Sequence, residues 1–222
     1  MGISERRERE KTERRQAILN SAKELVLSHG VEHISMDNIA EKAELSKATL
    51  YLYFSGKEHL LKEICEEAAK MFLTYLKSLH SAGFKGMAAI KYIWRGYVEM
   101  FGNSREMFVV FHVRKYLDSW MPIISMDGKD ESSSVNKILA ALKELIDECK
   151  AEGIFDPNLD STAATRLLLS LFFLIVEHAS SMPAETKEVS AVIEDMTNTF
   201  QIIIRGFAKE GIKHSLLDIK SL

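Results

Sequence analysis

Residues 46–54 carry side chains of the kinds that proteins use to contact the grooves of DNA. In a helix of 3.6 residues per turn, one face would carry Lys47, Ala48, Tyr51 and Leu52. A lysine can donate to phosphate or guanine, an alanine permits close approach, and an exposed leucine can contact thymine methyl groups. The opposite and adjacent positions are apolar enough to dock the helix onto its neighbours, and they are Leu50, Tyr53 and Phe54.

Two short helices would position these side chains. The spacing of Met36, Ile39, Ala40 and Ala43 is that of an amphipathic helix, and Ser35 and Ser46 are candidate N-caps. Two helices of about eight residues joined by a short turn form a helix-turn-helix, whose second helix can enter the major groove. The alternative is an ordinary pair of packing helices in an all-α protein.

The amino-acid sequence of this segment favours DNA binding. The sequence IAEKAELSKATLYLYFSGKEHLL, residues 39–61, closely resembles the DNA-binding domain of the TetR family of transcriptional regulators, and its Tyr-x-Tyr-Phe-x-x-Lys core is specific. The resemblance covers roughly residues 10–62. It implies a dimeric repressor that binds a double-stranded DNA operator, with a larger C-terminal domain that binds a small-molecule effector.

The resemblance also implies roles for single residues. Base edges would be read at the start of the recognition helix, by Lys47, Ala48 and Thr49. The aromatic positions that commonly touch phosphates are Tyr51 and Tyr53, although Tyr53 fits a core position equally well. Lys57 matches a phosphate contact at the N-terminus of the next helix, whose N–H groups would assist it. The two N-cap candidates, Ser35 and Ser46, complete the expected DNA-binding set.

One residue departs from the family pattern. The turn position that is usually glycine is Glu44. A non-glycine residue in a left-handed conformation costs about 1 kcal/mol, and a carboxylate near DNA repels phosphate. The turn is therefore expected to be slightly altered.

The N-terminal stretch from Glu5 to Arg15 holds six basic and four acidic residues. Glu5–Arg9 and Glu10–Arg14 are spaced i, i+4, which is typical of a solvated helix that pairs with itself. The other interpretation is an arm that reaches an adjacent DNA groove. Residues 1–58 hold ten basic and ten acidic side chains, so affinity for DNA must depend on where the cations sit.

The chain as a whole indicates an all-α protein without disulfides. It has 222 residues, 46% of them hydrophobic, with 3 prolines, 11 glycines and a net charge of −3. We expect a helix-turn-helix domain at residues 1–58, a ligand-binding and dimerisation domain at 59–222, and a helix over 57–81 that links them. The longest apolar run, 167–176, is too short for a bilayer span of about 20 residues, so a cytoplasmic protein without membrane contact is expected.

Beyond residue 80 the chain has no P-loop, HExxH, GxSxG or dinucleotide motif, so no catalytic site or cofactor is expected. Large aromatic residues on helices expected over 87–102, 104–119 and 160–181 favour a pocket for an apolar or aromatic effector. The candidate lining is Trp94, Tyr97, Phe101, Phe108, Phe111, His112, Tyr116, Phe172 and Glu177, with Arg95 and Glu99 as further polar groups. The alternative for each aromatic residue is the plain core. A metal site is not expected, because no second His or Cys stands at ligand spacing.

The helix expected over 160–181 is apolar on every side, so it needs cover from more than its own domain. The helix expected over 188–209 has a broad apolar stripe. Pairing both across a two-fold axis would form a four-helix homodimer interface. Two other classes of protein stay open: an all-α enzyme or small-molecule carrier that keeps the helix-turn-helix as scaffold, and a DNA-binding dimer without a ligand.

Overall fold

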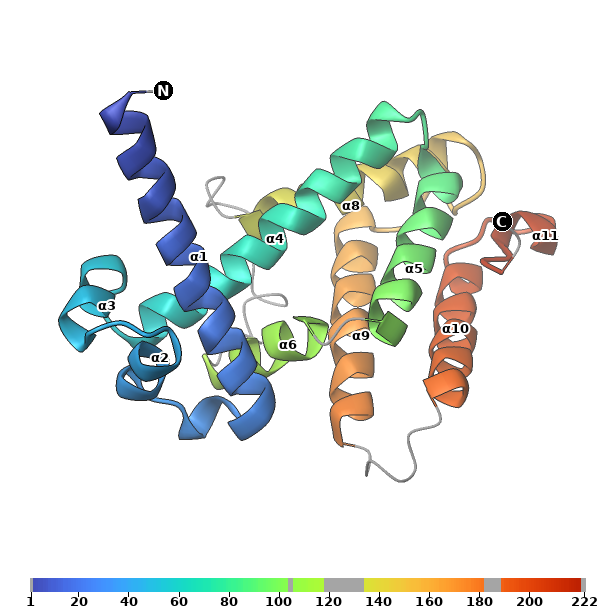
Figure 1. The fold of residues 1–222 in the computed structure, drawn as a ribbon. Coiled ribbons are helices and arrows are strands. Elements are labelled where there is room, and N and C mark those ends of the chain that lie inside the picture. The colour runs from blue at the N-terminus through green and yellow to red at the C-terminus, as the bar shows by residue number, and fades with distance from the viewer. Residues whose placement is uncertain (1, 104–105, 118–133, 182–188, 221–222) are drawn as a thin grey trace. The chain divides into compact units, whose positions relative to one another are not determined.

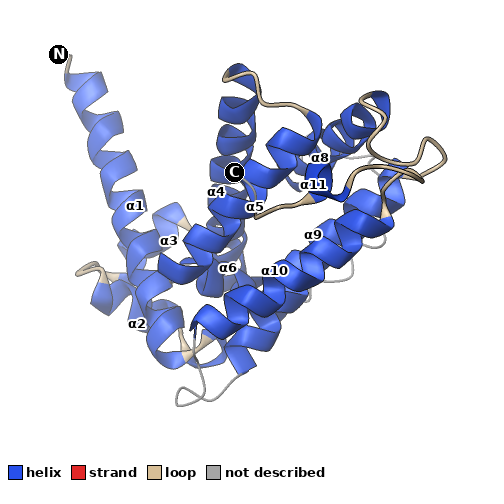
Figure 2. Cartoon of the chain, turned by 90° about the vertical axis from the view of Figure 1, so that its right-hand side faces the viewer, coloured by secondary structure: helices blue, strands red, loops and turns tan. Residues whose placement is uncertain are grey.

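The structure is a computed structural model that describes residues 2–103, 106–117, 134–181 and 189–220. Within these ranges the chain is helical, without a β-strand and with one isolated bridge between Phe155 and Ala208 (Figures 1 and 2). The all-α prediction is confirmed. The elements are α1 (Ile3–His29), η1 (Val31–His33), α2 (Met36–Lys42), α3 (Lys47–Tyr53), α4 (Lys57–Ser81), α5 (Gly86–Asn103), α6 (Glu106–Tyr116), α8 (Ser134–Ala151), α9 (Ser161–Ser181), α10 (Val189–Gly206) and α11 (His214–Leu217).

Two elements lie where the sequence has no apolar periodicity. Helix α1 begins at Ile3 and includes the charged stretch from Glu5 to Arg15, and the Glu5 carboxylate accepts from the Gly2 N–H at 2.8 Å. The tail after Gly211 contains α11. The Gln201 amide donates to the Leu217 carbonyl at 2.9 Å and accepts from the Ile219 N–H at 3.1 Å. These buried bonds explain why so short a helix is held in place.

The chain divides into two compact units, and α4 contributes to both. The first, here called the N-terminal unit, comprises residues 2–68 and 108–117 among those described. Its core joins the inward faces of α1 to α4 with two valines of α6, Val109 and Val113, which are fully or almost fully buried. A segment far along the sequence therefore completes the hydrophobic core of the helix-turn-helix.

The second unit, here called the C-terminal unit, contains the rest of α4 with α5, α8, α9, α10 and α11. Helix α8 packs against α5 and α9, and α10 packs against α5, α9 and α11. The Glu148 carboxylate of α8 accepts from the Gly86 N–H at 2.7 Å, so it satisfies a free donor at the N-terminus of α5. Among the residues described, no helix is both long enough and apolar enough to cross a bilayer.

Candidate nucleic-acid interface

The expected N-caps hold both helices of the helix-turn-helix in place. Ser35 forms a capping box with Asn38, in which the Asn38 N–H donates to Ser35 Oγ at 3.2 Å. Ser46 Oγ accepts from the Thr49 N–H at 3.1 Å and lies 2.8 Å from Thr49 Oγ1. The hydroxyls of three predicted DNA-contacting residues therefore take part in helix capping in the free protein. Ser35 and Ser46 remain exposed, whereas Thr49 is half-buried.

Helix α3 presents the two faces that its sequence predicts. Leu50 and the C-cap residue Phe54 are completely buried in the core of the N-terminal unit, and Tyr53 is half-buried against the same core. On the opposite side Tyr51 is 45% exposed and Leu52 is 84% exposed. The Leu52 side chain is therefore available for contact with another molecule. Lys47 and Ala48 complete this solvent face.

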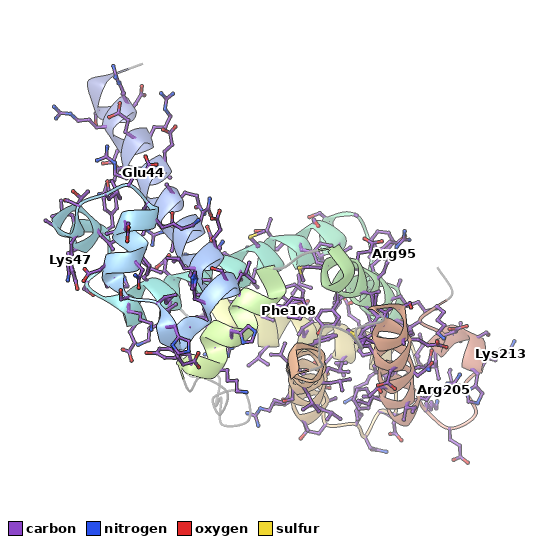
Figure 3. All side chains as sticks on the ribbon, turned by 60° about the horizontal axis from the view of Figure 1, so that its bottom comes forward. Glu44, Lys47, Arg95, Phe108, Arg205 and Lys213 are labelled. Atoms are coloured by element: carbon purple, nitrogen blue, oxygen red, sulfur yellow. The ribbon has the colours of Figure 1, made fainter. Side chains whose placement is uncertain are left out.

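A carboxylate of α2, the first helix of the helix-turn-helix, forms an ion pair with the lysine on this face of α3. Lys47 Nζ lies 2.7 Å from Asp37 Oδ1, and both side chains are mostly exposed. The hydrogen bond and the charge of Asp37 raise the pKa of Lys47, so the ammonium stays charged. To contact phosphate or a base, the Lys47 ammonium would first have to leave the Asp37 carboxylate. Figure 3 shows Lys47 at the surface of the N-terminal unit.

The turn between the helices adopts the geometry that glycine usually provides. Glu44 has φ 55°, and it is the only non-glycine residue at positive φ among those the structure describes. The Glu44 N–H donates to the Glu41 carbonyl at 3.0 Å, and the Leu45 N–H donates to the Ala40 carbonyl at 2.9 Å. These two bonds form a Schellman C-cap. The left-handed conformation is therefore kept although the residue is glutamate. The expectation of an altered turn is wrong, and the backbone strain lies at Glu44.

Replacing Glu44 with glycine should therefore raise the free energy of unfolding by about 0.5–1 kcal/mol, because glycine adopts a left-handed conformation without strain. Urea unfolding followed by circular dichroism measures the change. The matched control is Glu41→Gly, the same substitution inside α2, which should lower stability by about 1 kcal/mol. Lower stability in both variants would show that Glu44 carries no strain.

Lys57 was expected to contact phosphate, but in the free protein its ammonium is engaged within the N-terminal unit. Lys57 Nζ donates to the Val31 carbonyl at 2.6 Å and lies 4.6 Å from the centre of the Tyr116 ring. Tyr116, which was expected to line the effector pocket, covers this ammonium from the end of α6. The hydrogen bond and the cation–π contact tie the start of α4 to η1 and α6.

Four aromatic rings of the C-terminal unit pack together. Trp94 stacks on Phe200 with ring centres 4.2 Å apart, and the ring centres of Tyr97 and Phe172 are 4.6 Å apart. The Tyr97 hydroxyl donates to the Phe172 carbonyl at 2.6 Å, and burial raises the pKa of this phenol. The structure thus brings together three predicted lining residues and adds Phe200, which was missed. Its position in the apolar stripe of the last long helix was the available signal.

The other described candidates for the pocket lining lie in the N-terminal unit or are mostly exposed. Phe108 and His112 are half-buried residues of α6 in the N-terminal unit. The side chains of Phe101, Phe111 and Glu177 lie outside those that the structure describes. Arg95 and Glu99 pair with each other at 3.0 Å and are mostly exposed. A single pocket shared by all the candidates therefore stays a prediction.

The described residues offer little for metal or thiol chemistry. They contain no group of three or more His, Cys, Asp or Glu side chains that could hold a metal ion. Both cysteines are free, as expected. Burial raises the pKa of the Cys65 thiol to about 11, so this thiol is protonated and unreactive at neutral pH.

Comparison with known proteins identifies the helix-turn-helix. The family model described as "Bacterial regulatory proteins, tetR family" matches residues 18–64. The chain is 26% identical over 196 residues to the transposon Tn10 TetC protein of Escherichia coli, a match that spans 86% of this chain and 89% of that protein.

Solved structures share the fold over most of the chain. One is SmeT, the repressor of the multidrug efflux pump SmeDEF of Stenotrophomonas maltophilia, also solved as a complex with triclosan. The SmeT structure has a TM-score of 0.66 and 16% identity, over 89% of this chain and 91% of SmeT. Another is the regulator FadR of Bacillus subtilis in complex with stearoyl-CoA, with a TM-score of 0.65 and 15% identity over 89% and 99%. Residues 18–64 therefore form a DNA-binding domain of the TetR family of transcriptional regulators.

Proposed function

We propose that this regulator is a repressor that binds a pseudo-palindromic operator as a homodimer and is released by a small apolar or aromatic effector. The observation that carries the DNA-binding part is the solvent face of α3. A short helix whose opposite face fills the core presents Lys47, Tyr51 and Leu52 to solvent. A cation, a phenol and an apolar side chain suit contacts with phosphate, base edges and thymine methyl groups.

A direct experiment measures binding to the DNA upstream of the protein's own gene at two salt concentrations. A regulator is expected to bind one site far more tightly than random DNA, and its affinity should fall steeply as salt rises. Equal, weak binding to every duplex would contradict the proposal. That result would favour the other class of protein, an enzyme or carrier that keeps the helix-turn-helix as scaffold.

The homodimer rests on apolar side chains that α9 and α10 leave exposed. Leu167 and Leu174 of α9 are 49% and 59% exposed and seven residues apart, so they lie on one helix face. Ile202 of α10 is 70% exposed. Large apolar residues exposed on two neighbouring helices are typical of an oligomer interface. A second copy of the same two helices would cover them in a two-fold, four-helix contact.

The double variant Leu174→Arg/Ile202→Arg is expected to be monomeric, because each arginine would place an unpaired charge in the contact. Analytical ultracentrifugation measures the mass of the wild-type protein and of the variant. The matched control is Met71→Arg on α4, where the replaced side chain is 61% exposed and no dimer contact is proposed. A variant that keeps the wild-type mass would place the dimer contact elsewhere.

The effector class rests on the aromatic cluster of α5, α9 and α10. Its side chains are apolar except for one phenol, the hydroxyl of Tyr97. The molecules bound to two similar proteins agree in kind, since the triclosan of SmeT is aromatic and the stearoyl-CoA of FadR carries a long acyl chain. Mass spectrometry of small molecules that co-purify with the native protein tests this chemistry. If a ligand lowers operator affinity tenfold, operator must weaken binding of that ligand by the same factor.

A further inference from the structure

The first turns of α1 form a helix that contributes nothing to the core. Every described side chain from Ser4 to Arg14 is exposed, whereas Ile18, Ala22 and Leu25, further along the same helix, are buried. These turns extend roughly 18 Å at 1.5 Å per residue. Figures 1 and 2 both show them projecting beyond α2 and α3. We call residues 3–14 the α1 extension.

The cations of the DNA-binding region divide sharply into paired and unpaired groups. Residues 2–58 hold ten lysines and arginines. Six are in ion pairs with carboxylates, namely Arg6, Arg9, Arg15, Lys23, Lys42 and Lys47. A seventh, Lys57, donates to a backbone carbonyl. Within the part of the chain that the structure describes, the three without a partner are Arg7, Lys11 and Arg14, and all three belong to the α1 extension.

These three cations lie on one face of the helix. At 3.6 residues per turn, positions 7, 11 and 14 align with positions 18, 22 and 25. The latter three carry Ile18, Ala22 and Leu25, the residues by which α1 packs into the core of the N-terminal unit. The stripe of Arg7, Lys11 and Arg14 therefore continues the side of α1 that carries the helix-turn-helix.

The ion pairs of the extension leave this stripe free. The sequence suggested pairs Glu5–Arg9 and Glu10–Arg14, but the structure shows Arg6–Glu10 at 2.8 Å and Arg9–Glu13 at 3.4 Å. In this arrangement Arg14 has no carboxylate partner, and the paired arginines are Arg6 and Arg9, which lie off the stripe. Such pairs stabilise an exposed helix. The paired arginines therefore support the helix, while the unpaired cations are available to bind an anion.

We propose that Arg7, Lys11 and Arg14 bind the phosphate backbone of duplex DNA beside the segment that α3 contacts. This inference rests on the proposed DNA binding and adds a second contact surface to it. Residues 1–58 have no net positive charge. Their affinity for phosphate must therefore come from cations that are not paired with a carboxylate of the protein. A linear polyanion fits three cations along a straight helix better than a small anion does, because the stripe is extended and fully exposed.

The test uses two double variants of the full-length protein with identical composition. Arg7→Gln/Arg14→Gln removes two cations of the stripe, and Arg6→Gln/Arg9→Gln removes two paired arginines of the same helix. Binding to a long random-sequence duplex is measured over a range of salt concentrations. For each phosphate that the protein no longer neutralises, the slope of log affinity against log salt should become shallower by about 0.9. We expect this change in the first variant and almost none in the second.

Circular dichroism measures whether both variants keep the helix content of the wild-type protein. An unchanged salt slope for Arg7→Gln/Arg14→Gln would overturn the inference and leave the proposed function intact. Equal changes of slope in the two variants would also overturn it. The total charge of the helix, and not binding by one of its faces, would then explain the salt dependence. Failure of the wild-type protein to bind any duplex would overturn the proposed function itself, and this inference with it.

Discussion

Replacing Leu50 with alanine should lower the free energy of unfolding by about 2–5 kcal/mol. Leu50 is fully buried and lies on the inner face of a helix of only seven residues. Truncating its side chain removes apolar contacts with the core of the N-terminal unit and leaves a cavity there. The core also includes Phe54, at the end of the same helix, so truncation at Leu50 weakens the packed side of α3. Denaturant unfolding monitored by circular dichroism measures the effect.

The matched control is Leu52→Ala, the same change two residues further along the helix. Leu52 is 84% exposed, so its truncation should change stability by less than about 0.5 kcal/mol. The same variant should weaken operator binding if Leu52 contacts thymine methyl groups. A large drop in stability for Leu52→Ala, with none for Leu50→Ala, would mean that the two faces of α3 are assigned the wrong way round.

Lys47→Ala is expected to weaken operator binding by about tenfold or more, because the variant removes a donor to guanine or phosphate from each half-site. Its fold should be unaffected, since the side chain is mostly exposed and its ion pair with Asp37 lies at the surface. Asp37→Asn should have the opposite effect and tighten binding a few-fold. It removes the carboxylate that competes with DNA for the ammonium and that repels phosphate.

Fluorescence anisotropy with labelled operator measures both variants. Glu41→Gln is the control for Asp37→Asn, because it removes another exposed carboxylate of α2 and leaves the Asp37–Lys47 pair in place. If Asp37→Asn weakens binding as much as Lys47→Ala does, the ion pair orients Lys47 for DNA instead of competing with it. If neither variant changes affinity, Lys47 does not contact DNA.

The sequence predicted local features of the helix-turn-helix well. The two faces of α3 follow from helical periodicity, and both serine caps follow from side-chain chemistry next to the helix start. The resemblance that marked the turn position at Glu44 also located its left-handed backbone. Each of these features is decided within a few residues of chain, where the amino-acid types alone fix the available hydrogen bonds and packing.

Features that depend on distant segments were not predicted. The cover of Lys57 by Tyr116 joins two segments far apart in the chain, and no local pattern shows that an aromatic residue on α6 belongs to the N-terminal unit. Phe200 was missed as a partner of Trp94 for the same reason. Apolar periodicity does not predict the first turns of α1, because these turns lack an apolar stripe. Ion pairs and a continuous helix backbone, not burial, support those turns.

We propose that the solvent face of α3 binds a two-fold symmetric operator. Selection of duplexes by the native protein from a random-sequence pool tests it most directly. We expect an enriched pseudo-palindrome whose half-site centres are about one helical turn apart or a multiple of it, and a drop in affinity when either half is scrambled. Enrichment of a single asymmetric half-site, unaffected by scrambling its mirror position, would contradict the claim.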